Sequence, residues 1–173
     1  YFCEACPQSG SELWVLDRPN PAGRPIDCLF LEAGEESFVG CASLPTRHGI
    51  TVGELATYFK VLTKNELDLQ IIKMVDYQPS EPPGFGWPLL ARPWVNPSPN
   101  AASLNMARCF AGTVLLEGTT LSEGRGTTTP LEVIGAPDWP IHEVINELER
   151  EAPHVFAGAL IRPTFFSPTF HKH

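Results

Sequence analysis

The segment Thr51-Val-Gly-Glu-Leu-Ala-Thr-Tyr-Phe-Lys-Val-Leu62 carries the clearest secondary-structure signal in the chain. Thr51 is a preferred N-cap residue, and Glu54 three positions later completes a capping-box pattern. Apolar and aromatic residues then follow at the i, i+3, i+4 and i+7 spacing of one helix face, namely Leu55, Tyr58, Phe59 and Leu62. We therefore expect a helix to begin at Thr51, and this position favours a capping role for Glu54 over a catalytic one.

Short apolar runs lie on both sides of this helix. Leu13–Leu16 and residues 67–74 read as strands, with a possible further strand at residues 28–31. Later in the chain, residues 102–110 suggest a short helix that Asn100 can cap. A second clear helix starts at residues 138–140, because Ile141, Val144, Ile145 and Leu148 fall on one helix face. Further strands are expected at residues 113–116, 131–134 and 157–166. Because strands alternate with helices, the sequence predicts an α/β or α+β fold.

The composition is that of an ordinary globular protein and excludes several classes. Of the 173 residues, 43% are hydrophobic, yet no apolar run approaches the roughly 18 residues of a membrane span. The net charge of −8 argues against a nucleic-acid backbone as partner. Eighteen prolines predict a loop-rich chain with short elements.

The cysteines do not suggest a metal site. Cys3 and Cys6 form a C-x-x-C pair, but no second cysteine pair or histidine pair completes a zinc-binding set. Three residues apart in an expected helix at residues 2–8, they are more typical of packed thiols than of a metal or redox centre. The nucleotide-binding glycine motifs are also missing, so we predict no metal and no cofactor.

A polar loop at residues 115–130 is the strongest candidate for a site. Two glutamates, Glu117 and Glu123, and one arginine, Arg125, lie among glycines and hydroxyl side chains that include Ser122 and Thr127. Burying so many polar groups without partners is costly. The residues alone leave two readings open: a ligand-binding loop and a solvated surface loop.

Three further segments offer polar side chains. Asp17, Arg18 and Asn20 follow the first strand, where prolines fix the backbone, and strand ends are common ligand sites in α/β sheets. A local salt bridge between Asp17 and Arg18 is the alternative. Arg47 and His48 precede the helix N-terminus at Thr51, a position that favours anions. A proline-rich loop is expected at residues 77–99, and its tryptophans, Trp87 and Trp94, either stack on a ligand or close the core edge. The end of this loop presents Ser98, and Asn100 follows it directly.

Five motifs in order along the chain resemble the exo-β-N-acetylmuramidase family. They span residues 16–21, 47–56, 94–100, 117–127 and 135–137. The resemblance implies a glycoside hydrolase that releases terminal N-acetylmuramic acid from the non-reducing ends of peptidoglycan fragments. It further implies a bacterial protein of cell-wall recycling, active in the cell envelope, with a Rossmann-like domain followed by a smaller α/β domain and a site between them.

This resemblance also implies that the chain is a piece. We expect residues 1–45 to end the Rossmann-like domain and residues 46–173 to form most of the second domain. The family's proposed catalytic glutamate lies in a Pro-Glu-His-Gly segment that would precede Tyr1, so Glu123 and Glu117 are candidates only for a second carboxylate. Arg125 is expected to read the lactyl carboxylate of muramic acid, with Arg47 as the alternative.

Some positions depart from the family pattern, and other functions stay open. Asp76-Tyr77 stands where the family has Gly-Trp, Leu131 replaces Phe, and Ala101-Ala102 replaces Met-Pro. A non-catalytic module that binds sugar is one alternative function. A hydrolase of phosphorylated small molecules, with Arg47 and Arg125 clamping the anion, is another.

Overall fold

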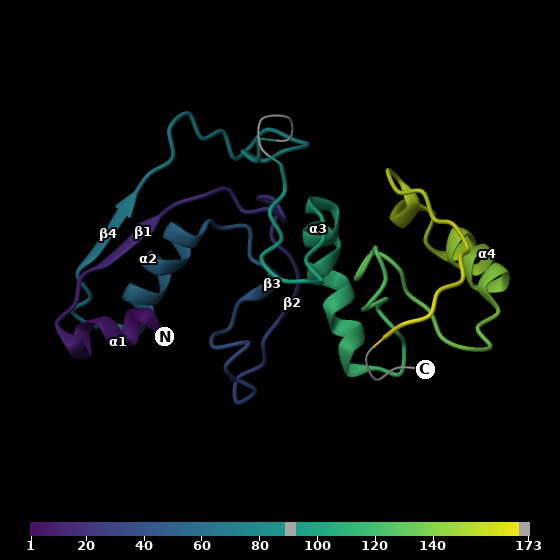
Figure 1. Cartoon of the computed structure of the whole chain (residues 1–173), viewed down its shortest axis with the longest axis horizontal. Coiled ribbons are helices and arrows are strands. Elements are labelled where there is room, and N and C mark those ends of the chain that lie inside the picture. Colours follow the sequence, from purple (N-terminus) through teal and green to yellow (C-terminus); the bar gives the residue numbers. More distant parts are fainter. Residues whose placement is uncertain (89–92, 170–173) are drawn as a thin grey trace. The chain divides into compact units, whose positions relative to one another are not determined.

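The computed structural model describes residues 1–88 and 93–169 (Figure 1). The chain divides into two compact units, Tyr1–Val95 and Asn96–His173. Four residues of the proline-rich loop expected at residues 77–99, 89–92, lie outside the described residues, as do residues 170–173. Each unit is described separately below.

The first unit contains a small parallel sheet. Its elements are α1 (Phe2–Ser9), β1 (Leu13–Leu16), β2 (Asp27–Phe30), β3 (Pro45–Arg47), α2 (Val52–Thr63) and β4 (Leu69–Ile72). Strands β1 and β4 pair in parallel, with Leu13 opposite Leu69 and Leu16 opposite Ile72. Strands β2 and β3 form a separate antiparallel pair. A parallel pair needs a crossover connection, and α2 lies in that connection, so the α/β class expected from the sequence is confirmed.

Helix α2 begins as the capping box requires. The Thr51 hydroxyl accepts a hydrogen bond from the Glu54 backbone N–H at 3.2 Å, and the Glu54 carboxylate accepts one from the Thr51 N–H at 2.9 Å. The helix ends at Lys64, which adopts a left-handed conformation with φ of 51°. The predicted start at Thr51 is therefore confirmed.

The buried face of α2 differs from the face suggested by its large apolar residues. Helix α2 packs on β1 and β4, and its buried residues are Gly53 and Ala56, whereas Leu62 is 50% exposed. A Cβ atom on Gly53 would lie 2.8 Å from Cγ of Asp17 and 2.9 Å from the Ile71 side chain. Small residues, which apolar periodicity does not detect, thus set the close approach of helix and sheet.

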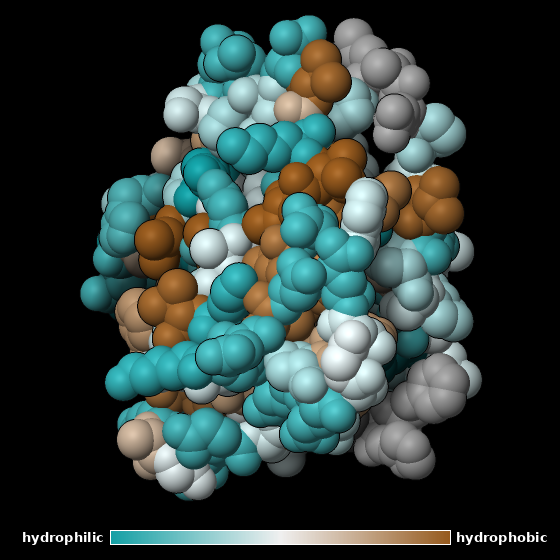
Figure 2. Space-filling model, turned by 90° about the vertical axis from the view of Figure 1, so that its left-hand side faces the viewer, coloured by the Kyte–Doolittle hydropathy of each residue, from teal (hydrophilic) through white to brown (hydrophobic). Residues whose placement is uncertain are grey.

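One face of the parallel pair is open. Side chains alternate along both strands, and Ile71 lies on the face that packs against Gly53 of α2. On the other face Trp14 is 57% exposed, Leu16 73% and Ile72 47%. Figure 2 views the end of the molecule that carries α1, β1 and β4, and apolar surface is visible there between hydrophilic side chains. Parallel sheets are usually covered on both faces.

The unit boundary differs from the expected domain boundary. The division expected between residues 45 and 46 falls inside the first unit, because β1 pairs with β4 and packs on α2 across it. The compact units separate instead between Val95 and Asn96.

The second unit is mainly helical in its described part. It contains α3 (Leu104–Thr113), the 3-10 helix η1 (Val114–Gly118), α4 (Ile141–Glu151) and the 3-10 helix η2 (Pro153–Phe156). The N-cap of α3 is Ser103, whose hydroxyl accepts a hydrogen bond from the Met106 N–H at 2.8 Å, so the expected cap at Asn100 is wrong. Ala101, Met106 and Leu131 form a small core cluster.

Three expected strands of this unit are not formed. Residues 113–116 continue from α3 into η1, since their amides bond back to nearby carbonyls. Residues 131–134 and 157–166 have no partner strand among the described residues, and apolar character alone does not make a ladder. The extended pairing that does form is an isolated antiparallel bridge between Ser122 and Gly135.

The two cysteines of the C-x-x-C pair and the two tryptophans of the proline-rich loop lie in the first unit. Cys3 and Cys6 lie on α1 as free, half-buried thiols, and burial raises the pKa of Cys3. Trp87 and Trp94 contact each other with ring centroids 5.4 Å apart. Both are half-buried.

Candidate functional site

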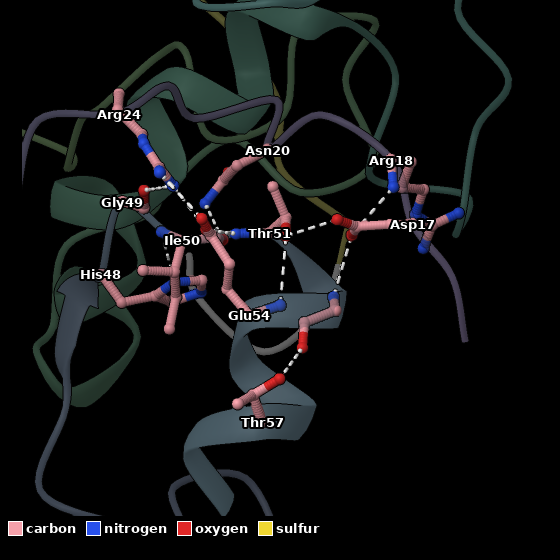
Figure 3. A network of polar contacts seen from close by, with 11 residues as sticks. Asp17, Arg18, Asn20, Arg24, His48, Gly49, Ile50, Thr51, Glu54 and Thr57 are labelled. Carbon is pink, nitrogen blue, oxygen red and sulfur yellow. Dashed lines mark hydrogen bonds and ion pairs between the residues drawn. The ribbon is translucent and has the colours of Figure 1, made fainter. Parts of the chain in front are cut away.

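The carboxylate of Asp17 joins the end of β1 to the start of α2. Its Oδ2 accepts a hydrogen bond from the Thr51 hydroxyl at 2.9 Å, and its Oδ1 accepts bonds from the backbone N–H groups of Gly53 at 2.9 Å and Arg18 at 3.0 Å (Figure 3). Thr51 is only 1% exposed. Asp17 therefore bonds the helix start and not the Arg18 guanidinium, and the Arg18 side chain is exposed.

An ion pair that was not predicted from the sequence lies beside this contact. Arg24 donates from Nη2 to Glu54 Oε1 at 2.8 Å and from Nη1 to Glu54 Oε2, and Nη1 also donates to the Gly49 carbonyl at 3.0 Å (Figure 3). The hydrogen bond from Arg24 lowers the pKa of Glu54, and the same bond raises the pKa of Arg24. Arg24 and Glu54 are 30 residues apart in the sequence, so no local residue spacing predicts the ion pair.

The other predicted residues of the first unit also bond to its own loops. Asn20 donates from Nδ2 to the Ile50 carbonyl at 3.0 Å, and Arg47 donates from Nε to the Ala22 carbonyl at 3.0 Å. His48 accepts at Nδ1 from the Ile50 N–H at 3.2 Å, and burial lowers the pKa of His48. These contacts bring Asn20, Arg47 and His48 to the same loops, ahead of α2.

The start of α2 is already supplied with anionic groups. The N–H groups of Thr51 and Gly53 bond to the carboxylates of Glu54 and Asp17, and the N–H of Glu54 bonds to the Thr51 hydroxyl. A helix N-terminus binds anions through such N–H groups and through its dipole. Because protein carboxylates occupy these donors, the arrangement does not favour a phosphate at this position.

In the second unit, the polar loop is built around a buried carboxylate. Glu123 is 3% exposed, and Arg125 donates to it from Nε at 2.9 Å. Arg125 also forms an ion pair through Nη2 with Glu117, a half-exposed carboxylate. Burial opposes the charge of Arg125, but its hydrogen bonds and the charges of Glu117 and Glu123 raise its pKa. The structure thus brings the two predicted carboxylates together on one guanidinium.

Tight turns fix the rest of this loop. Gly124 and Gly126 have φ values of 74° and 83°, and a Cβ on Gly126 would overlap the side chain of Thr169. Thr127 donates its hydroxyl proton to the Gly124 carbonyl at 2.6 Å, while the Thr169 N–H donates to the Arg125 carbonyl at 2.9 Å. Residues 122–124 and Pro130 of this loop are therefore packed inside the fold, whereas residues 117–120, 126, 128 and 129 are exposed.

A pocket of about 450 Å³ lies next to this loop within the second unit. It is lined by Ser122, by residues 134–139 and Ile141, and by residues 164–168. Ser122 is 3% exposed, and its hydroxyl accepts a hydrogen bond from the Gly124 N–H at 3.2 Å. Of the residues expected to form a site, Ser122 is the one in the pocket lining.

Ser98 and Asn100 lie elsewhere in the second unit. They belong to a turn in which the Ala101 N–H donates to the Ser98 carbonyl at 3.0 Å. Ser98 is exposed and Asn100 is half-buried. Across residues 1–88 and 93–169, no three His, Cys, Asp or Glu side chains are grouped so that they could hold a metal ion. In that same part of the chain, none of the helices has the length and apolar character of a membrane span.

Comparison with known sequences places both units in one family. A family model described as exo-β-N-acetylmuramidase NamZ, N-terminal, matches residues 1–105, and its C-terminal counterpart matches residues 108–173. A relative named peptidoglycan β-N-acetylmuramidase NamZ, from Bacillus subtilis strain 168, is 38% identical over the whole chain. The chain spans 40% of that relative's length.

Two solved structures resemble the chain over most of its length. Both are crystal structures of DUF1343 family proteins from Bacteroides fragilis NCTC 9343, with TM-scores of 0.66 and 0.76 and identities of 32% and 26%. They cover 78% and 86% of this chain, which in turn covers 37% and 38% of theirs. With the two halves of the family matched in order along its length, the chain belongs to the exo-β-N-acetylmuramidase NamZ family.

Proposed function

We propose that the complete protein is an exo-acting glycoside hydrolase that releases terminal N-acetylmuramic acid from peptidoglycan fragments. The observation that carries this proposal is the match of both family halves, residues 1–105 and 108–173, together with the name of the Bacillus relative. The chain alone spans less than half of that relative, so the proposal concerns the protein that contains it.

Glycoside hydrolysis commonly uses two carboxyl groups, one as acid and one as base or nucleophile. The first is expected in a segment ahead of Tyr1. Glu123 is the candidate for the second, and its ion pair with Arg125 suits the role that needs a charged carboxylate. Glu117, which shares Arg125, is the alternative.

Recognition of muramic acid needs a cation for the lactyl carboxylate, and a guanidinium binds both oxygens of such a group well. Arg125 already serves two glutamates. Arg47 commits its Nε to the Ala22 carbonyl, and no hydrogen bond of its two terminal amino groups is found among the described residues. This comparison makes Arg47 a better candidate than Arg125 for reading the lactyl group.

The decisive experiment is the release of N-acetylmuramic acid by the complete protein from a muramyl-glucosamine disaccharide, followed by mass spectrometry. The Glu123→Gln variant should lower kcat roughly 100-fold or more with little change in KM, as loss of acid–base help does. No release by the complete wild-type protein would reject the proposal. A folded variant with unchanged kcat would reject only the role of Glu123.

A non-catalytic sugar-binding module is the second candidate, favoured by the pocket in the second unit. It predicts saccharide binding by the complete protein without turnover. Hydrolysis of phosphorylated molecules is less well supported, because Asp17 and Glu54 occupy the donors at the start of α2. Competition by inorganic phosphate in the same release assay would favour it.

A further inference from the structure

The pocket of the second unit has the size of a site for a small molecule. Its volume of about 450 Å³ falls within the roughly 300–1,000 Å³ of small-ligand sites. Three segments far apart in the sequence form its walls: Ser122 beside the polar loop, residues 134–139 with Ile141 at the start of α4, and residues 164–168. None of the segments is long enough to make such a site alone.

Specific contacts hold these segments in place. The backbones of Ser122 and Gly135 exchange two hydrogen bonds, of 2.8 and 3.0 Å. A Cβ on Gly135 would stand 3.1 Å from the ring of Phe166, so the aromatic ring packs directly on the backbone there. Just beyond the lining, the Thr169 N–H bonds to the Arg125 carbonyl. The pocket is therefore built on hydrogen bonds and close packing.

The lining combines aromatic rings with hydroxyl groups and a single carboxylate. It includes Trp139, Phe166, Ser122, Thr164, Ser167 and Asp138. The Ser122 hydroxyl already accepts a hydrogen bond from Gly124, which leaves its proton for another acceptor. No Lys, Arg or His occurs among the described residues that line the pocket. Among the described residues of the lining, an anionic ligand would thus meet Asp138 without a compensating cation.

From this chemistry we infer that the pocket binds a neutral N-acetylated amino sugar. Aromatic faces suit the apolar faces of a pyranose ring, and hydroxyl and carboxylate groups suit its hydroxyls and amide. The inference rests on the proposed function and deepens it. In a muramyl-glucosamine substrate the neutral unit is the N-acetylglucosamine on the leaving side of the cleaved bond. The muramic acid and the acidic groups of a stem peptide are disfavoured by Asp138.

The test is titration calorimetry on the complete protein with methyl N-acetyl-β-glucosaminide, in the presence of saturating N-acetylmuramic acid. Trp139→Ala should weaken binding at least about 5-fold through the lost aromatic contact, and Trp139→Phe should restore part of it. Leu160→Ala, at a side chain in the same unit that is 86% exposed and outside the lining, is the matched control and should bind like the wild type.

A second variant tests the charge argument at an exposed position. Asp138→Lys should strengthen binding of methyl N-acetyl-β-muramide about 10-fold relative to the glucosaminide, because a cation then faces the lactyl carboxylate. The inference is overturned if Trp139→Ala leaves glucosaminide binding unchanged, or if Asp138→Lys leaves this preference unchanged. Should Trp139→Ala fail to fold, the Asp138→Lys result decides alone.

Turnover of the disaccharide by the wild-type protein is measured in parallel. If muramic acid is released but glucosaminide binding does not depend on Trp139, the inference about the pocket is rejected and the proposed function stands. If the glucosaminide binds in a Trp139-dependent manner but no muramic acid is released, the proposed function is rejected. The pocket is then a sugar-binding site that cannot be assigned to the leaving side of a cleaved bond.

Discussion

Oδ2 of Asp17, at the end of β1, accepts a hydrogen bond from the Thr51 hydroxyl, the N-cap of α2, at 2.9 Å. Oδ1 of the same carboxylate accepts from the Gly53 N–H at 2.9 Å. One side chain therefore fixes the sheet to the first turn of the helix. Asp17 was predicted from its position after β1 to contact a ligand. Both of its carboxylate oxygens instead accept hydrogen bonds within the fold.

Replacing Asp17 should destabilise the first unit. Asp17→Ala removes hydrogen bonds to a charged acceptor and should cost about 2 kcal/mol in the free energy of unfolding. Asp17→Asn should cost about 1 kcal/mol, because an amide offers one oxygen where the carboxylate offers two. Urea unfolding of the complete protein measures both. An Asp17→Ala protein as stable as the wild type would show that these contacts contribute nothing.

The pair of Arg24 and Glu54 should give the protein an acid-sensitive contribution to stability. Arg24 lowers the pKa of Glu54 in the folded state, so the stabilisation is present above the unfolded pKa of the glutamate and is lost as pH falls through the folded value. Because Glu54 is 41% exposed, Arg24→Ala should cost only about 1 kcal/mol at pH 7. Urea unfolding near pH 7 and near pH 4 should show a smaller pH dependence in this variant. An identical pH dependence would contradict the assignment.

His48 should contribute to the pH dependence of stability in a range above that of Glu54. Burial lowers its folded pKa, and its Nδ1 accepts a hydrogen bond, as only the neutral ring can. The unfolded chain then takes up a proton first as pH falls below roughly 6.5, so stability decreases in that range and is complete above it. His48→Asn should flatten the stability profile between about pH 5 and 7. A profile that stays as steep as in the wild type would rule His48 out as its source.

Arg125→Ala should lower activity by destabilising the polar loop at residues 115–130, and not by removing a contact with the substrate. It removes the ion pair between Arg125 and the buried Glu123 and should destabilise the protein by about 3 kcal/mol. Activity on a muramoside and on the matching glucosaminide should then fall equally. A loss confined to the muramoside would instead show that Arg125 reads the lactyl carboxylate.

A double variant checks this reading of the Arg125 site. Adding Glu123→Gln to Arg125→Ala removes the buried charge that has lost its contact with Arg125, so part of the lost stability should return. Thermal unfolding of the two single variants and the double variant gives the coupling between the residues. Additive losses would mean that the 2.9 Å contact between Arg125 and Glu123 carries no net stabilisation.

The open face of β1 and β4 predicts self-association of the 173-residue chain expressed alone. Trp14 and Leu16 expose apolar surface on a parallel sheet that packs on a helix from the other side. Leu16→Lys, at a position 73% exposed, should reduce association without loss of packing. Analytical ultracentrifugation of the wild-type chain and of the Leu16→Lys variant measures the extent of self-association. A monomeric wild-type chain with sharp cooperative unfolding would contradict this prediction.

The sequence by itself determined the features that depend on neighbouring residues. The capping box at Thr51 and Glu54 fixed the start of α2, because its hydrogen bonds join groups three residues apart. The apolar periodicity after residue 140 likewise indicated α4. The order of the five motifs also sufficed to indicate the family. None of these required knowledge of the packing.

Only the tertiary structure decided the features that join distant residues. Arg24 meets Glu54 across 30 positions, and Asp17 meets Gly53 across 36. The strands expected at residues 131–134 and 157–166 failed to form because a strand exists only where a partner offers its backbone, and local apolar character does not reveal a partner. The burial of Glu123 under Arg125, and the pocket that three separate segments enclose beside it, follow from the same long-range packing.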